Sequence, residues 1–277
     1  MTTRGLAVWS LSTLGSALIT NNPVYRILVL LAAANVVVAL AADRARALAL
    51  GLTLAGAFAV ALNVLLGHSG MHVLVVLPGW LPGIGGPLTL ESLAYGLDVA
   101  GGLAAAILAV APLSLAADPT ELVDALPRVF ERAGTSLAAA LGFVPAIAQS
   151  FTAVSDAQRM RGWRPRGPRS WGEVLVPVMV TAIENSIQLA ESMESRGFGA
   201  GPRTRYPRPR SSAWNLTVPL LAVIAFAGLA AERVSGAIPD WYPLPALQPP
   251  DVKAFGVICC LLLGGPALLW RSQPSIG

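Results

Sequence analysis

Two Arg-Gly pairs, at residues 161–162 and 196–197, are the groups in this sequence best suited to bind a partner. An arginine at the end of a rigid helix presents a planar fork of donors that matches a carboxylate. The glycine after it lets the backbone turn away without a side chain in the partner's groove. With the residue before each pair, the predicted docking residues are Met160, Arg161, Gly162, Ser195, Arg196 and Gly197.

A single Arg-Gly pair has a simpler structural explanation. Glycine is the preferred residue just after a helix, and arginine near a helix C-terminus complements the helix dipole. Here, however, each pair is followed by an aromatic residue, Trp163 or Phe198, and then by a Gly-Pro-Arg tract. This duplication favours docking over helix termination alone.

The composition predicts an all-α, polytopic membrane protein. The chain has 277 residues, of which 55% are hydrophobic and 12% charged. Its mean hydropathy is +0.64, and its apolar runs lack the alternation expected of a β-barrel. The net charge of +4 reflects membrane topology rather than nucleic-acid binding, because the arginines cluster beside predicted spans. Cys259 and Cys260 are adjacent, which excludes a zinc site or a disulfide framework.

Apolar runs predict about six transmembrane helices. They cover residues 5–19, 24–42, 47–66, 90–116, 214–231 and 254–270. With the N-terminus inside, all basic residues except Arg26, Arg233 and Lys253 fall on the cytoplasmic side. This distribution predicts a multi-pass plasma-membrane protein with both termini in the cytoplasm.

The chain divides by this interpretation into N-terminal membrane helices (1–117), cytoplasmic coupling helices (118–211) and C-terminal membrane helices (212–277). Residues 118–169 are expected to be too polar to span. Asp118-Pro119-Thr120-Glu121 is a typical helix start, and we expect this first helix to end near residue 132, with Gly134 as the break. Two longer amphipathic helices are expected at 135–161 and 171–196, kinked by Pro145 and Pro177.

This pattern resembles the transmembrane T component of energy-coupling factor (ECF) transporters, which import vitamins and metal ions. The similarity covers about residues 20–232. It rests on residues 158–162 and 191–198, on Asp118-Pro119, and on Asn22-Pro23. The family usually has alanine before each Arg-Gly pair, whereas this chain has Met160 and Ser195.

The resemblance implies a non-catalytic scaffold with several partners. Its two motifs would dock into grooves of two ABC-type ATPase subunits, and its membrane helices would contact a small substrate-binding membrane subunit and the bilayer. No cofactor is expected in this chain, because the partner subunits bind ATP. The sequence also lacks a phosphate-binding loop and suggests no catalytic residue. The transported substrate is not encoded in these motifs.

Two other functions fit the sequence less well. A conventional ABC permease subunit would need one coupling loop and a polar lining among its spans, and these spans have few polar residues. A membrane enzyme acting on lipid would need acids or histidines near the interface. The residues that come close are Glu91, Asp98, His68 and His72.

Several polar residues keep more than one interpretation. His68 and His72 have the spacing of a metal pair, but no cysteine or carboxylate accompanies them in the sequence, so no metal site is predicted. Asp98 is an intramembrane acid that could form a salt bridge, cap a helix or face a partner. Glu184 and Glu191 suit a solvated or interhelical face. The arginine-rich segment 203–210 fits either lipid headgroups or a solvated linker.

Overall fold

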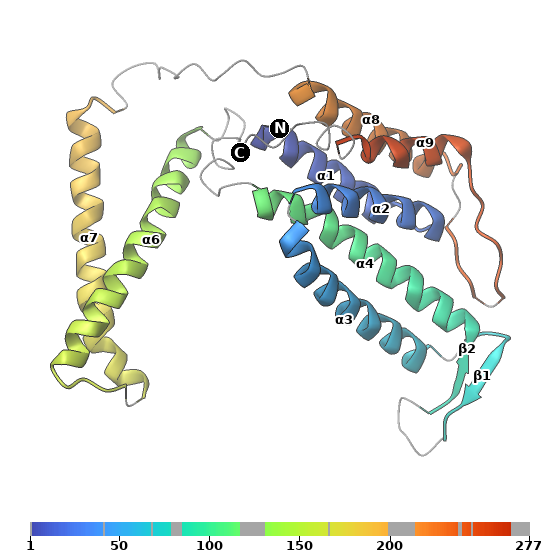
Figure 1. Cartoon of the computed structure of the whole chain (residues 1–277), viewed down its shortest axis with the longest axis horizontal. Coiled ribbons are helices and arrows are strands. Elements are labelled where there is room, and N and C mark those ends of the chain that lie inside the picture. Colours follow the sequence, from blue (N-terminus) through green and yellow to red (C-terminus); the bar gives the residue numbers. More distant parts are fainter. Residues whose placement is uncertain are drawn as a thin grey trace. The chain divides into compact units, whose positions relative to one another are not determined.

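The computed structural model describes residues 2–40, 42–67, 69–78, 85–116, 131–165, 167–198, 214–237, 240–244 and 246–266. These residues form eight α-helices, a short 3-10 helix and a two-stranded hairpin (Figure 1). The chain divides into two compact units. One comprises Met1–Ala117 with Ser211–Gly277, and the other is Asp118–Arg210.

The first unit is a helical bundle. Its helices are α1 (Thr3–Ile19), α2 (Pro23–Leu40), α3 (Ala42–Leu66), α4 (Leu90–Ala116), α8 (Trp214–Val234) and α9 (Ala254–Leu263). Helix α1 packs against α8 and α4, α2 packs against α4 and α9, and α3 packs along α4. The second unit contains α6 (Glu131–Met160), the 3-10 helix η2 (Pro168–Trp171) and α7 (Gly172–Ser195).

The all-α membrane fold is confirmed. Six of the described helices are long and apolar enough to cross a membrane, judged by length and composition. They cover 23–40, 46–66, 90–116, 136–160, 169–195 and 215–234. This set differs from the predicted one. Helix α1, with 17 residues, and helix α9, described over 10, are too short to be counted among the candidate spans. Residues 267–270 of the predicted last span lie outside the described part of the chain.

Helix α1 lies in the core of the bundle despite its polar sequence. Its buried serines and threonines are small, which allows close helix approach. Thr13 and Ser16 donate hydrogen bonds to carbonyls one turn earlier, at 2.8 Å each. Trp9 is fully buried, and its Nε1 donates to the Leu263 carbonyl at 3.0 Å, which joins α1 to α9.

Two expectations about the central region need correction. Gly134 does not break the chain, because α6 begins at Glu131 and runs through it. A glycine costs about 1 kcal/mol in a helix interior relative to alanine, which a long alanine-rich helix tolerates. Part of the segment 118–169 is apolar. The stretch 136–160 is apolar and long enough to span a membrane, because its charged residues are confined to its last turns. The first predicted helix falls mainly outside the described residues.

A β-hairpin between α3 and α4 was not predicted. Strand β1 (Val73–Val76) pairs antiparallel with β2 (Pro87–Thr89), with Val73 opposite Thr89 and Val76 opposite Pro87. Residues 73–76 of the uncharged apolar stretch 73–80 therefore form a strand. The boundaries drawn at 118 and 211 between membrane and cytoplasmic parts stay a prediction.

Candidate docking site at two helix ends

The two Arg-Gly pairs adopt the same backbone turn. At the end of α6, Gly162 N–H donates to the Arg159 carbonyl at 3.0 Å and Trp163 N–H donates to the Gln158 carbonyl at 2.9 Å. Gly162 has φ +88°, the left-handed conformation that favours glycine. This pair of bonds is the Schellman motif, in which the residue before the glycine is the C-cap.

The end of α7 repeats this geometry. Gly197 N–H donates to the Glu194 carbonyl at 2.9 Å, Phe198 N–H donates to the Met193 carbonyl at 3.0 Å, and Gly197 has φ +74°. Arg196 is thus the C-cap of α7, as Arg161 is of α6. The sequence duplication is therefore a structural duplication.

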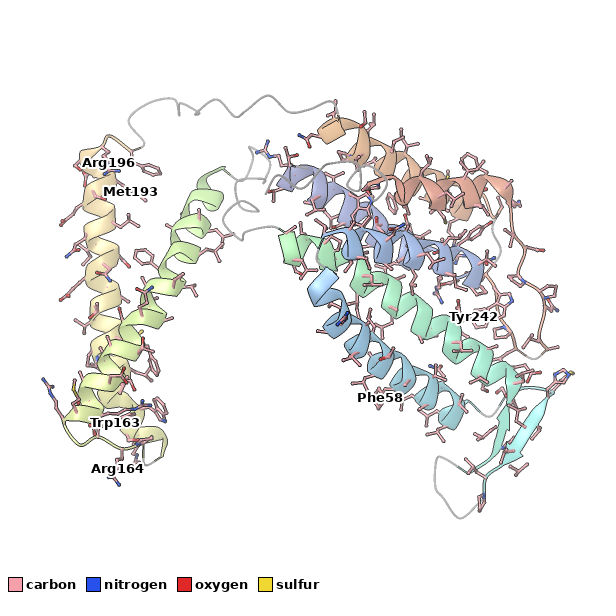
Figure 2. All side chains as sticks on the ribbon, viewed as in Figure 1. Phe58, Trp163, Arg164, Met193, Arg196 and Tyr242 are labelled. Atoms are coloured by element: carbon pink, nitrogen blue, oxygen red, sulfur yellow. The ribbon has the colours of Figure 1, made fainter. Side chains whose placement is uncertain are left out.

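The two arginines lie at opposite ends of one helix pair. Helices α6 and α7 are antiparallel, and Figure 2 shows Trp163 and Arg164 at one end of the pair and Arg196 at the other. Helix α7 has 24 residues, which corresponds to a length of about 36 Å. The predicted docking residues therefore do not form one site. They form two, separated by a helix length.

A small core holds the first site. Trp163, Val174 and Val178 are buried together, with Phe151 and Val154 packed against them. Trp163 Nε1 donates to the Ser170 carbonyl at 3.0 Å. The Trp163 ring meets the Trp171 ring edge-on, with centroids 5.5 Å apart. The turn from α6 into α7 is thereby fixed, and Trp163 occupies a slot in its own chain.

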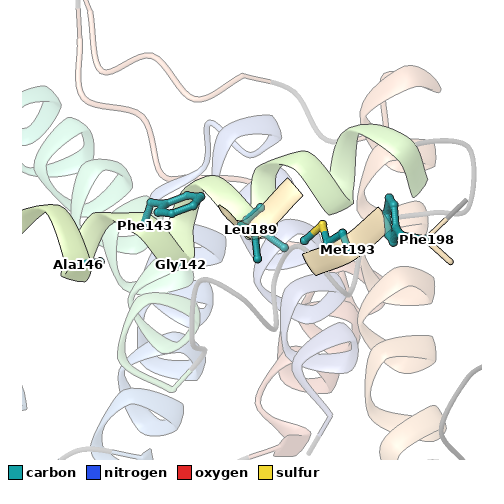
Figure 3. A pocket seen from close by; sticks show the side chains of 8 residues that line it. Gly142, Phe143, Ala146, Leu189, Met193 and Phe198 are labelled. Atoms are coloured by element: carbon teal, nitrogen blue, oxygen red, sulfur yellow. The ribbon is translucent and has the colours of Figure 1, made fainter. Parts of the chain in front are cut away.

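Among the described residues, no such core surrounds the second site. Phe198 has 58% of its surface exposed and lines a groove of about 460 Å³ between the two helices (Figure 3). Its lining is apolar and comes from α6, from α7 and from the residue that follows the second Arg-Gly pair: Ala138, Ala139, Gly142, Phe143, Ala146, Leu189, Met193 and Phe198. The aromatic residue that follows the second pair is thus available to a partner.

Both arginines are exposed, and within the described residues neither guanidinium has an ion-pair partner. The residues before them differ. Met160 has 84% of its surface exposed, whereas the hydroxyl of Ser195 donates to the Ser192 carbonyl at 2.9 Å. Each helix end therefore offers an exposed cation and one exposed apolar side chain, Met160 at the first and Phe198 at the second.

Other polar candidates have structural partners. Glu91 is fully buried and accepts hydrogen bonds from the backbone N–H groups of Met71 (3.3 Å) and His72 (3.2 Å). His72 Nδ1 lies 2.7 Å from the same carboxylate. His68 lies outside the described residues. Glu184 and Glu191 are exposed, and the described residues contain no group of three potential metal ligands.

Asp98 forms a buried ion pair with Arg26. Of the three roles considered for Asp98, the structure shows the salt bridge. Arg26 also donates to the Thr20 carbonyl at 2.9 Å and to Asn21 Oδ1 at 2.8 Å. The sequence pattern placed Arg26 outside the membrane and did not predict this pairing. The signal was present, because an arginine one turn inside an apolar helix needs a partner.

The ion pair continues into a surface network. Asn21 Nδ2 donates to Asp240 at 2.8 Å, and Arg233 donates to the same carboxylate at 2.8 Å. The hydrogen bond from Arg233, helped by that from Asn21, holds the pKa of Asp240 below its usual value. This network ties the segment after α8 to the start of α2.

The sequence was compared with models of protein families. The model of the cobalt transport protein family CbiQ matches residues 2–207, more than half of the chain. The chain belongs to this family. CbiQ is the family of ECF transporter T components, so the resemblance is confirmed. A search of curated proteins found no match.

Membership of CbiQ makes the chain a membrane component of a transport system. Members of this family are parts of multi-subunit transporters. The match includes both Arg-Gly turns and ends before α8.

Proposed function

We propose that this chain is the energy-coupling subunit of an ECF-type ABC importer. It would transmit motion from two ATPase subunits to a substrate-binding membrane subunit. The observation that carries the proposal is the pair of matching Schellman turns, each with an exposed arginine at the C-cap, at opposite ends of one antiparallel helix pair. Two equivalent, widely separated cationic ends suit two related partners.

Each end would insert into a groove of one ATPase. The guanidinium at each C-cap is exposed, and its planar fork can bind a carboxylate with two hydrogen bonds. ATP, bound by the partners, would draw the two ATPases together. Because the Trp163 core fixes α6 to α7 at one end, the motion would reach the membrane bundle as a rotation of the helix pair. That rotation would reorient the substrate-binding subunit.

The arginines also support a cytoplasmic position for α6 and α7. If both helices crossed the membrane, the turn that carries Arg159, Arg161 and Arg164 would lie opposite the arginine-rich segment 203–210. The positive-inside rule disfavours that arrangement. On this argument α6 and α7 lie along the membrane surface, with both turns and both termini in the cytoplasm.

An exposed apolar stripe on α7 supports a membrane partner for the helix pair. Val176, Val180, Ile183 and Ile187 are each about half exposed or more and recur at spacings of three and four. Such a stripe needs cover by lipid or by another protein. We assign it to the substrate-binding subunit. Cobalt is the first substrate to test, given the family, with vitamins as the alternative class.

The decisive experiment is co-purification with the two ATPases. The variant Arg161→Glu/Arg196→Glu should lose the ATPases almost entirely, because removing one partner of a buried charge pair costs about 2–5 kcal/mol and glutamate adds repulsion. The matched control is Arg164→Glu/Arg169→Glu, which changes the same number of exposed arginines away from the C-caps. Binding and uptake by the first variant at parental levels would refute the coupling role, and equal loss in both variants would refute the assignment to these two turns.

Topology can be tested independently of the partners. In a background without Cys259 and Cys260, we expect Arg161→Cys and Arg196→Cys to resist a membrane-impermeant maleimide in intact cells and to react after permeabilisation. Asp251→Cys, exposed in the loop before α9, is the expected externally labelled control. Labelling of one turn but not the other in intact cells would mean that α7 crosses the membrane.

A further inference from the structure

The hairpin between α3 and α4 exposes apolar side chains on both of its faces. All four residues of β1, Val73 to Val76, have between 51 and 69% of their surface exposed. Successive side chains of a strand point to opposite sides, so neither face of β1 packs on the bundle. The sequence contains no charged residue and no histidine from Val73 to Leu90. An isolated two-stranded hairpin of this composition would be unstable and prone to aggregate in water.

The base of the hairpin is nevertheless firmly attached to the bundle. The buried Glu91 carboxylate accepts hydrogen bonds from the Met71 and His72 backbone. Thr89 Oγ1 donates to the Ser69 carbonyl at 3.0 Å, and Leu90 N–H donates to the His72 carbonyl at 2.9 Å. These bonds hold the hairpin at the start of α4, where Figure 1 shows it extending beyond the ends of α3 and α4.

The adjoining helix surface is apolar as well. Along α3, large apolar residues recur every four positions and are all exposed: Leu50, Leu54, Phe58, Leu62 and Leu66. Because α3 is a candidate span, we expect this stripe to face lipid. It ends at Leu66, the last residue of α3, and the hairpin comes next in the chain. Six residues, 67–72, separate the end of this stripe from the apolar strand β1.

The backbone of the hairpin limits how deep it can lie. The outer edge of a two-stranded hairpin carries unpaired N–H and C=O groups, which are costly in hydrocarbon. Headgroups and water satisfy such groups in the interfacial layer, where apolar side chains still reach the acyl chains. Apolar residues on both faces with open edges fit this layer better than either water or the hydrocarbon core.

We propose that the β1–β2 hairpin is a lipid anchor that lies in the membrane interface, in the leaflet where α3 ends and α4 begins. It would fix the depth and tilt of α3 and α4 in the bilayer. The anchor depends on the chain being a membrane protein and not on ATPase coupling. The hairpin would contact phospholipid. The alternative that the experiment distinguishes is contact with a partner subunit.

The test is site-directed spin labelling of the full chain alone in vesicles of phosphatidylcholine and phosphatidylglycerol. In a background without Cys259 and Cys260, the labelled positions are Val75→Cys, Phe58→Cys as the lipid-facing control and Asp251→Cys as the aqueous control. Phe58 is 65% exposed on α3 (Figure 2). We expect the Val75 label to collide with oxygen more often than with a water-soluble nickel chelate, as at Phe58, and the reverse at Asp251.

A Val75 label as accessible to nickel as the Asp251 label would overturn the proposal. So would a label that is aqueous in these vesicles and becomes shielded only when the substrate-binding subunit is added, since that result assigns the hairpin to a protein partner. Val76→Cys is a second labelling position in case the first disturbs the strand. Gel filtration of each variant confirms that it is folded before the vesicles are made.

Discussion

The two ends of the α6–α7 pair share one backbone turn but use their aromatic residues differently. At the first end Trp163 is 9% exposed and belongs to a core with Val174 and Val178. At the second end Phe198 is 58% exposed and borders an open apolar groove. The same sequence pattern, Arg-Gly-aromatic, thus produces a closed end and an open one.

The closed end is built by the segment of chain that follows Trp163. After Trp163 the chain turns back through η2 into α7, so the ring meets Trp171 and the first turns of α7. Residues 199–213, which follow Phe198, lie outside the described part of the chain. On the proposed docking role, the first end is preorganised for its partner, and the partner at the second end would cover Phe198.

The largest expected effect concerns stability. We expect Trp163→Ala to destabilise the α6–α7 unit by about 3–5 kcal/mol, as for other buried aromatic truncations, and Phe198→Ala to have little effect. The measurement is amide hydrogen exchange of residues 151–178 in the full chain. Trp163→Phe should be intermediate, because it keeps the ring but loses the 3.0 Å bond to the Ser170 carbonyl. Equal exchange in the two alanine variants would contradict the distinction between a closed and an open end.

The next effect concerns affinity. Phe198→Ala should weaken ATPase binding by about 2 kcal/mol, the usual range for an apolar anchor at an interface, without changing exchange in α6 and α7. Met160→Ala is the matched variant at the first end, because Met160 supplies the exposed apolar side chain there. Titration of the ATPases against each variant in detergent measures the loss. If both variants bind like the parent, the arginines act without apolar anchors.

The helix ends were well predicted because their signal is local. Glycine after the last turn defines a left-handed C′ position, and α6 and α7 end within one residue of the expected places. The family and the membrane fold also followed from local motifs and composition. Which aromatic residue is buried could not be predicted, since it depends on contacts across the turn from Trp163 to Val174 and Val178.

Other features were missed for the same reason. Arg26 and Asp98 are distant in sequence, and their pairing depends on how α2 packs on α4. The hairpin carries a short uncharged apolar run, and such a run does not distinguish a strand from a helix. Gly134 was overvalued as a helix breaker, because alanines and leucines around it support continuation.

The smallest expected effect is one that should be the same at both ends. Gly162 and Gly197 have φ of +88° and +74°, and an L-residue in this conformation costs about 1–2 kcal/mol. Gly162→Ala and Gly197→Ala should therefore each fray the last turn of their helix by a similar amount, measured by exchange of the two amides in the Schellman bonds. Space is not the obstacle at Gly162, where an added Cβ would meet nothing within 4 Å. Gly142→Ala, in α6 with equally open surroundings and no positive φ, is the control and should be neutral or stabilising. A much larger cost at Gly162 than at Gly197 would mean that the Trp163 core, rather than the glycine turn, sets the geometry of the first end.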